Sequence, residues 1–357
     1  MKIDFISSSL TGGGAERVLV LLANHFSEKG HQVNIITFNK GEAYLIHTSV
    51  SRIRLHSGKF KNHKLRSINS LIAHYKDENN RPDIVISFIT NTNFISILAA
   101  KYYGIKIICS EHINYLQKGN YLTKFTRNVM YRFVNHVTVL TSFDLPFYKK
   151  KNINVSVMPN PCTYAPIALN NSNRQKVIIA VGNLDRFHHK GFDNLINLIT
   201  PVLKDNKDWI LKIIGEGNNG NDFLKKLAIK NNIENQIIFT GFRNDINLIM
   251  QESSIFIMSS RYEGLPMVLI EAMSQGMACI SYDCRTGPAD IIDHKKNGLL
   301  IENQNMEAMQ NGLLELMNDV SLRNNLRIQA IKSLDRFTIE NIGHQWEQLF
   351  RELQLPK

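Results

Sequence analysis

The chain has 357 residues, of which 43% are hydrophobic and 20% are charged, as in globular proteins that fold in water. It has no run of about 18 apolar residues, so no transmembrane helix is expected. The first residues are typical of a strand and lack the apolar segment of a secretory signal. The four cysteines are scattered without a CxxC pair, which predicts reduced thiols in a cytoplasmic protein.

The net charge of +11 is unevenly placed. Residues 1–165 hold 21 Lys and Arg against 9 Asp and Glu, whereas the rest of the chain is nearly neutral. This asymmetry favours an anionic partner that meets only the first half. No recognised nucleic-acid motif accompanies the charge, so an anionic membrane surface is expected and nucleic acid is not.

Short apolar runs rich in β-branched residues alternate with helical patterns along the whole chain. In the first half the predicted strands are 3–7, 33–38, 84–88, 106–109 and 137–140, and the predicted helices are 15–27, 93–103 and 122–135. In the second half the strands are 177–181, 210–214, 237–240, 255–258 and 278–281, and the helices are 192–203, 222–230, 246–252, 267–275 and 306–319. The alternation predicts βαβ units and parallel sheets.

The length favours two domains. Three prolines within residues 158–166, followed by the polar stretch 170–175, predict a linker between two Rossmann-like domains. We expect an N-terminal domain over residues 1–165 and a C-terminal domain over residues 166–336. An amphipathic helix within 337–357 is expected to pack back toward the first domain.

Glycines follow the first predicted strand directly. Gly12, Gly13 and Gly14 stand where the strand turns into a helix, so their amides can approach a phosphate. The third Gly of the dinucleotide fingerprint is missing, and no GK[ST] of a Walker loop follows. A tight turn without a ligand is the alternative.

The second domain repeats this arrangement. Arg186 and Lys190 lie in the loop after the strand 177–181, where Lys190 can meet a phosphate as a point charge. Gly215 directly follows another strand, and ligands of doubly wound folds sit at such strand ends. An ordinary surface lysine is the alternative for Lys190.

Two glutamates mark the segment 260–276. Glu263 lies in a Gly/Pro loop just before a helix, and Glu271 lies eight positions later in an apolar helix that we expect to be buried nearly all round. Pro266 suits the first turn of that helix. Carboxylates accept hydroxyl groups and a helix N-terminus attracts anions, so the pair favours a ligand that is part sugar and part phosphate. Either Glu alone could be an ordinary helix residue.

His112 follows the strand 106–109 in the sequence Ser-Glu-His. Its place at a carboxyl strand end favours a functional role, although a lone histidine is more often structural.

Together these motifs resemble the retaining glycosyltransferases of family 4, over nearly the whole chain. The matching residues are 13–17 (GGAER), 110–112 (SEH), 159–161 (PNP), 190–191 (KG), 215–217 (GEG), 263–266 (EGLP) with Glu271, and 286–288 (TGP). The resemblance implies an α/β GT-B fold, in which two Rossmann-like doubly wound parallel-sheet domains face a central cleft that holds a nucleotide-sugar.

The resemblance also implies roles for single residues. Glu263 and His112 would contact the donor sugar and Glu271 the ribose, while Lys190 and the Gly13–Gly14 loop would meet the diphosphate. His112, Glu263 and Lys190 are the expected catalytic residues, and the further donor-binding residues are Gly13, Gly14, Arg186, Gly215, Gly264, Leu265, Met267, Val268 and Glu271. The family usually has Arg where this chain has Asn183, and Arg186 is the expected substitute.

The expected reaction transfers a hexosyl or N-acetylhexosaminyl group from a UDP-sugar to a glycan or lipid-linked glycan in surface polysaccharide biosynthesis. No DxD motif stands at a strand end, so a metal-independent site without a cofactor is expected. The basic and aromatic stretches 59–66 and 121–133 predict acceptor and membrane contacts at the inner face of the cell membrane. A nucleotide-sugar epimerase and a non-catalytic nucleotide-sugar binder are the alternatives.

Overall fold

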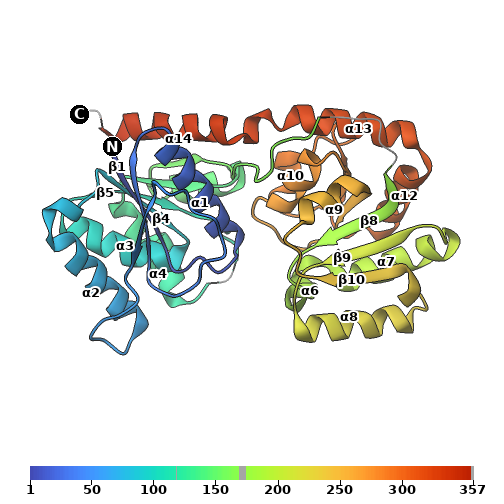
Figure 1. Cartoon of the computed structure of the whole chain (residues 1–357), viewed down its shortest axis with the longest axis horizontal. Coiled ribbons are helices and arrows are strands. Elements are labelled where there is room, and N and C mark those ends of the chain that lie inside the picture. Colours follow the sequence, from blue (N-terminus) through green and yellow to red (C-terminus); the bar gives the residue numbers. More distant parts are fainter. Residues whose placement is uncertain (118, 169–173, 355–357) are drawn as a thin grey trace. The chain divides into compact units, whose positions relative to one another are not determined.

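The structure, a computed structural model, describes residues 1–117, 119–168 and 174–354. It divides into two compact units (Figure 1). Unit 1 comprises Met1–Pro161 together with the segment that begins at Ile339, and unit 2 comprises Cys162–Thr338. Residues 170–173 of the predicted linker and residues 355–357 of the predicted last segment lie outside the described residues.

Unit 1 is built on a parallel sheet. Over its described residues the sheet has seven strands in the order β3-β2-β1-β4-β5-β6-β7. The strands are β1 (Lys2–Ser7), β2 (Gln32–Thr37), β3 (Ser51–Arg54), β4 (Ile84–Phe88), β5 (Lys106–Ser110), β6 (His136–Val139) and β7 (Val155–Val157). The chain builds outward from β1 to β3 and then returns to β4, which pairs with the other side of β1. The strand order therefore reverses between β1 and β4, the place where ligands bind in such folds.

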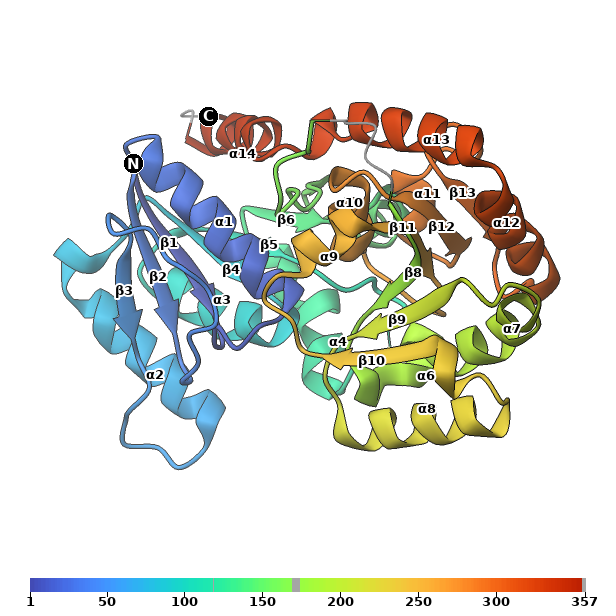
Figure 2. The same cartoon turned by 45° about the vertical axis from the view of Figure 1, so that its right-hand side comes forward.

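Helices cover the sheet of unit 1. They are α1 (Gly14–Glu28), α2 (His63–Lys76), α3 (Thr90–Tyr102), α4 (Tyr121–Asn128), α5 (Leu145–Lys149) and α14 (Ile339–Gln354). Helix α14 comes from the far end of the chain and packs on α1, as Figures 1 and 2 show. The rings of Phe26 and Phe350 lie 5.3 Å apart at this contact.

Unit 2 repeats the architecture. In the part that the structure describes, six parallel strands follow the order β10-β9-β8-β11-β12-β13. They are β8 (Gln175–Val181), β9 (Ile210–Ile214), β10 (Ile237–Gly241), β11 (Ser253–Met258), β12 (Ala278–Asp283) and β13 (Leu299–Glu302). The order reverses between β8 and β11, which lie side by side with Ile178 next to Ile255.

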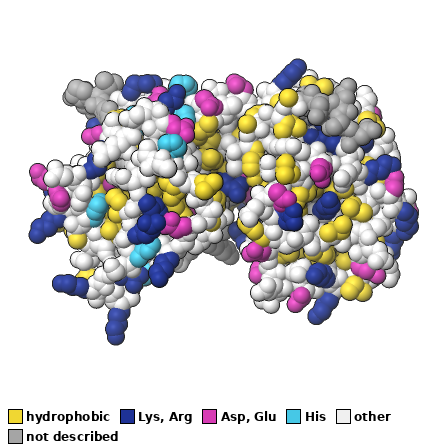
Figure 3. Space-filling view, in the orientation of Figure 1, with side chains coloured by type: hydrophobic (Ala, Val, Ile, Leu, Met, Phe, Trp, Pro, Cys, Tyr) yellow, Lys and Arg dark blue, Asp and Glu magenta, His cyan; other side chains and the backbone are white. Residues whose placement is uncertain are grey.

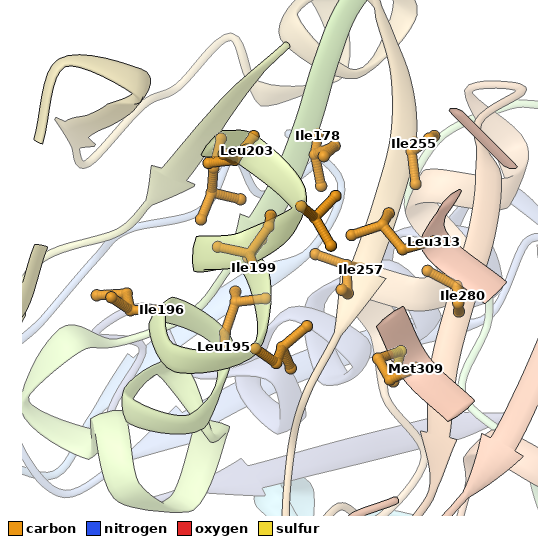
Figure 4. Packing of buried hydrophobic residues seen from close by; sticks show 14 of the residues in the cluster. Ile178, Leu195, Ile196, Ile199, Leu203, Ile255, Ile257, Ile280, Met309 and Leu313 are labelled. Atoms are coloured by element: carbon orange, nitrogen blue, oxygen red, sulfur yellow. The ribbon is translucent and has the colours of Figure 1, made fainter. Parts of the chain in front are cut away.

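The strands of unit 2 are apolar because helices cover the sheet. The helices are α6 (Phe187–Lys190), α7 (Phe192–Asp205), α8 (Asn218–Lys230), α9 (Ile246–Glu252), α10 (Met267–Ser274), α11 (Pro288–Ile291), α12 (Met306–Asn318) and α13 (Val320–Ser333). Figure 4 shows Leu195 and Ile199 of α7 packed with Ile257 of β11 and Leu313 of α12 in one buried cluster.

The two parallel sheets and the predicted strands are confirmed. One predicted helix is wrong in extent. The helix expected over residues 122–135 ends at Asn128, and a separate 3-10 turn follows over Met130–Phe133. The β-branched Val129 between them has φ −120° and ψ −59°, which lies outside the α-helical range and ends the helix.

Candidate functional site

An ion pair lies at the switch point of unit 2. Lys190 ends α6 in the segment after β8, and Glu263 lies in the loop after β11. The Lys190 ammonium donates to Glu263 Oε1 at 2.8 Å, and the two side chains are 18% and 10% exposed. The fold therefore brings together two of the predicted site residues, one from the segment after each strand that flanks the reversal.

Two hydroxyl groups fix Glu263. Ser260 Oγ donates to the same Oε1 at 2.6 Å, and the Thr286 hydroxyl donates to the backbone carbonyl of Glu263. The carboxylate is thus held by Ser260 and Lys190, and the backbone of Glu263 is held by Thr286 from the loop after β12. Sequence reasoning gave Ser260 no role, although its spacing of three residues before Glu263 is the signal that could have indicated one.

Glycines allow the loops of this site to approach one another closely. Gly191 has φ 68°, and a Cβ there would stand 1.9 Å from the carbonyl oxygen of Ser259. Gly215 has φ 147°, and its Cβ would stand 1.9 Å from the carbonyl oxygen of Gly182. Only glycine fits either position, so the loops after β8, β9 and β11 depend on them.

A pocket of about 530 Å³ opens beside these loops. It lies at the carboxyl ends of β8, β9 and β10, and its lining includes Gly215, Gly217, Phe239 and Phe242. Its volume is within the range of small-molecule sites. The aromatic residue directly after the Thr-Gly of β10, Phe242, was not predicted as a site residue.

Helix α10 carries the second glutamate. Glu271 is buried in it together with the other residues from Leu269 to Ser274, which confirms the predicted burial. Pro266 is the N-cap rather than a first-turn residue, and it makes no side-chain capping bond. The predicted donor-binding residues lie at this helix start, with Gly264 and Leu265 in the preceding loop and Met267 and Val268 in the first turn.

The contacts described for Arg186 are with His189 and do not include the Lys190–Glu263 ion pair. Arg186 ends the 3-10 turn Leu184–Arg186, is exposed, and its Nη2 lies 3.3 and 3.4 Å from the ring nitrogens of His189. Burial lowers the pKa of His189, and the charge of Arg186 lowers it further. The neutral imidazole can therefore hold the guanidinium without charge repulsion.

The glycine loop of unit 1 already holds an anion. Glu16 Oε2 accepts from the amides of Gly12 and Gly13 at 3.0 and 3.3 Å, and its Oε1 accepts from Ser9 Oγ at 3.0 Å. Gly13 is the N-cap of α1, and Gly14 is its first residue. The chain's own carboxylate thus binds at the position that the sequence predicted for a phosphate.

His112 lies beside the switch point of unit 1. Its ring stacks on Phe88, which ends β4, with the ring centroids 4.9 Å apart, and Ser110 Oγ lies 3.1 Å from its Nε2. Burial lowers the pKa of His112 to about 3, so the ring is neutral at physiological pH.

The basic stretch 121–133 is only partly a surface. Arg127 is 5% exposed and pairs with Glu111 at 2.6 Å, so the expectation that it faces a membrane is wrong. The exposed residues of the stretch are Tyr121, Lys124, Phe125, Asn128, Val129, Arg132 and Phe133. Figure 3 shows further Lys and Arg side chains at the end of unit 1 formed by α2 and the loop before it.

No cluster of three or more His, Cys, Asp or Glu side chains suited to a metal ion occurs in the described ranges. None of the helices, over the residues that were placed, has the length and apolar character needed to cross a membrane.

Comparisons with known proteins agree across both units. A family model described as Glycosyltransferase Family 4 matches residues 12–162, and one described as Glycosyl transferases group 1 matches residues 166–333. The chain is 29% identical to an uncharacterized glycosyltransferase of Haemophilus influenzae, over 97% of this chain and 99% of the relative.

The chain is 31% identical to a Campylobacter jejuni protein over 99% of both chains. That protein is named as the α-1,4-N-acetyl-D-galactosaminyltransferase of GalNAc-α-(1→4)-GalNAc-α-(1→3)-diNAcBac-PP-undecaprenol. The fold is similar to the crystal structure of Anabaena HepE in complex with UDP and glucose, with a TM-score of 0.82, 16% identity, and coverage of 98% of this chain and 99% of that one.

Proposed function

The chain belongs to the GT-B glycosyltransferases, and we propose that it transfers a hexosyl or N-acetylhexosaminyl group from a UDP-sugar, with retention, to a glycan or lipid-linked glycan. The observation that best supports a donor site is the Lys190–Glu263 ion pair at the switch point of unit 2. Such a pair presents an ammonium to phosphate and a carboxylate to hydroxyl groups within one small site.

The surroundings of the pair accommodate the rest of a nucleotide-sugar. The start of α10 beside Glu263 offers first-turn amides to phosphate. The pocket that contains Phe242 can receive the base against an aromatic wall. Glu271 is proposed to meet the ribose. The complex of a structural neighbour with UDP supports uridine as the nucleoside.

The proposed step breaks the bond between the sugar C1 and the diphosphate oxygen. The acceptor oxygen bonds to C1 on the same face, and its proton passes to the departing diphosphate. Lys190 stabilises the negative charge that grows on the diphosphate. Arg186 stabilises the same charge once the Arg186 guanidinium turns away from His189. We propose that these cations act without a metal ion, so EDTA is expected to leave the rate unchanged.

The acceptor proposal is carried by the relatives. The Campylobacter jejuni protein is named for a glycan linked to undecaprenyl diphosphate, and it matches this chain over nearly its full length. We propose an acceptor of the same chemical class, in which a saccharide hydroxyl attacks while a lipid diphosphate anchors the saccharide.

A panel of UDP- and GDP-sugars tests the donor site. Lys190→Gln and Glu263→Gln are expected to weaken UDP-sugar binding by about 10- to 100-fold in calorimetry. Each removes a charged partner that we propose for the donor, Lys190 for the diphosphate and Glu263 for the sugar hydroxyls. Lys176→Gln is the matched control, since Lys176 forms an exposed ion pair with Asp208 in the same unit. Equal affinities in all three variants would place the donor elsewhere.

The product separates the competing functions. Retention predicts that NMR finds the donor's anomeric configuration in the product, and an inverted anomer would exclude it. An isomerised nucleotide-sugar formed without acceptor would identify an epimerase. Binding of UDP without turnover on any glycan acceptor would identify a non-catalytic binder.

We further propose that unit 1 associates with the inner face of an anionic membrane. On α4 and the turn after it, Tyr121 is 93% exposed, and Phe125, Phe133 and Lys124 are also exposed. Aromatic side chains with an adjacent lysine suit a membrane interface. The parent protein should co-sediment with phosphatidylglycerol vesicles at low salt, and the double variant Tyr121→Ser/Phe125→Ser should not. If the parent protein does not bind the vesicles, the proposal is excluded.

A further inference from the structure

A buried ion pair joins helix α4 to the sheet of unit 1. Arg127 of α4 donates from Nε and Nη2 to Glu111 Oε2 at 3.0 and 2.6 Å. The other carboxylate oxygen accepts from Thr90 Oγ1 at 2.7 Å and from the Tyr131 hydroxyl. Every named partner is at most 5% exposed. A charged pair at such depth needs this full set of hydrogen bonds to offset its desolvation.

The same guanidinium holds both neighbours of His112. Besides the Glu111 side chain, Arg127 Nη2 donates to the carbonyl oxygen of Ile113 at 3.3 Å. Its Nη1 donates to the carbonyl oxygen of Tyr115 at 3.4 Å. The segment that carries His112 is therefore fixed on either side by one side chain from α4.

The opposite wall of His112 is fixed by the same cluster. Phe88 stacks on the His112 ring, and Thr90, two residues later, donates to Glu111. Between them Ile89 has φ 72°, an unfavourable value for a β-branched residue. Strain of this kind persists where surrounding contacts over-determine the backbone, and it is concentrated at functional sites.

We propose that Arg127 is a positioning residue that sets the orientation of His112 through Glu111 and the Ile113 carbonyl. The inference rests on the proposed function, together with the contact to the donor sugar that the family resemblance implies for His112. A purely structural ion pair would need only Glu111, whereas the bonds of Arg127 to two carbonyl groups beyond His112 serve to shape that segment.

The test uses substitutions that do not leave a buried charge unpaired. Glu111→Gln/Arg127→Met removes both charges and keeps the side-chain volumes close, which avoids the large cost of a single unpaired partner. Arg127→Lys keeps the charge but replaces the fork of donors by one ammonium, which cannot reach all three acceptors. Lys149→Gln is the control, since Lys149 is exposed at the end of α5, outside the stretches expected to meet acceptor or membrane.

Two measurements on the full chain are made for each variant. The first is kcat and KM with a UDP-sugar. The double variant should lose about 10- to 100-fold in kcat with KM nearly unchanged, because a displaced group near the reacting centre costs that much. Arg127→Lys should lie between the double variant and the parent.

The second is the NMR titration of the His112 ring, assigned with His112→Gln. Burial alone lowers the pKa of His112 to about 3, and the two partners described for its ring, Phe88 and Ser110, carry no charge. In the parent the ring should not titrate between pH 5 and 8. In the double variant its midpoint should move toward 6.5 as the segment loosens.

The outcomes separate the two proposals. A shifted titration with reduced kcat supports positioning. A shifted titration with unchanged kcat supports positioning and excludes the role of His112 in the reaction. An unshifted titration in both the double variant and Arg127→Lys overturns the proposal, as does an equal effect of Lys149→Gln.

Discussion

Asp4 is a carboxyl group buried in the apolar sheet of unit 1. It accepts from Asn34 Nδ2 at 2.6 Å and from the Tyr75 hydroxyl at 2.8 Å. Burial raises the pKa of Asp4 from 3.8 to about 6, and these hydrogen bonds oppose the rise only in part. The folded protein therefore keeps this proton at pH values where the unfolded chain has lost it.

The raised pKa predicts how stability depends on pH. The free energy of unfolding should fall as pH rises from about 4 to 6 and be constant above, with a total change of up to about 3 kcal/mol. Asp4→Asn should abolish this slope and be more stable than the parent at pH 7, because the amide can accept from Asn34 and donate to Tyr75. Urea unfolding between pH 4 and 8 measures it.

Asp222→Asn, an exposed change in unit 2, is the control for this measurement. A slope in Asp4→Asn equal to that of the control would show that Asp4 ionises normally in the folded protein.

At the scale of single residues, the sequence indicated groups whose position follows from local order. Lys190 lies between β8 and α7, Glu263 lies between β11 and α10, and Glu271 lies within α10, so their surroundings could be predicted. The environment of Arg127 could not. Its amphipathic segment has the same pattern as a solvated helix, and its partner Glu111 lies sixteen residues earlier, on another element.

Among the elements, α1 has a feature that bears directly on phosphate binding. Glu16 in its first turn accepts the amides of Gly12 and Gly13, so a diphosphate would have to compete with it. A carboxylate there also stabilises the helix dipole. The loop is therefore stable without a ligand, at some expense of anion affinity.

Removing the charge of the Glu16 carboxylate should improve the binding of a diphosphate at the Gly12 and Gly13 amides. Glu16→Gln is expected to lower the stability of unit 1 by about 1 kcal/mol and to tighten UDP binding several-fold, since a neutral amide competes less well. Calorimetry with UDP and with uridine measures the effect, which should be confined to UDP. Glu28→Gln at the other end of α1 is the control; equal UDP affinity in both variants would contradict the competition.

Two of the elements that were not predicted from the sequence, β3 and α2, have local patterns that do not reveal them. Strand β3 is Ser-Arg-Ile-Arg at the sheet edge, so it lacks the apolar run by which buried strands were predicted. Helix α2 begins at His63 under an Asn62 cap, within a basic stretch that we interpreted only as an interaction surface. Packing rather than local pattern decides such segments.

For the whole molecule, the contact between α1 and α14 closes unit 1. Gly343 of α14 lies against His25 of α1, and a Cβ at Gly343 would stand 2.2 Å from His25 Nε2. Both residues therefore set how closely the two helices approach.

A double-mutant cycle tests this closure. Gly343→Ala should destabilise unit 1 by about 1 to 3 kcal/mol through overpacking. In a His25→Ala background the same change should stabilise by up to about 1 kcal/mol, because alanine favours the helix. Equal effects in both backgrounds would show that His25 does not limit the approach.

The two tryptophans make the cycle specific to a unit. Trp346 is buried in α14 of unit 1, and Trp209 is buried in unit 2. Fluorescence of Trp346 in a Trp209→Phe protein should follow the effect, whereas Trp209 in a Trp346→Phe protein should not change.

The return of the chain to unit 1 has a consequence for synthesis. A ribosome makes the seven strands of the described sheet of unit 1 first, then all of unit 2, and only afterwards α14. During translation Phe26 lacks the side chain of Phe350, against which it packs in the finished fold. The unit begun first is thus the last to be completed, and the nascent chain exposes the apolar face of α1 for as long as unit 2 is being made.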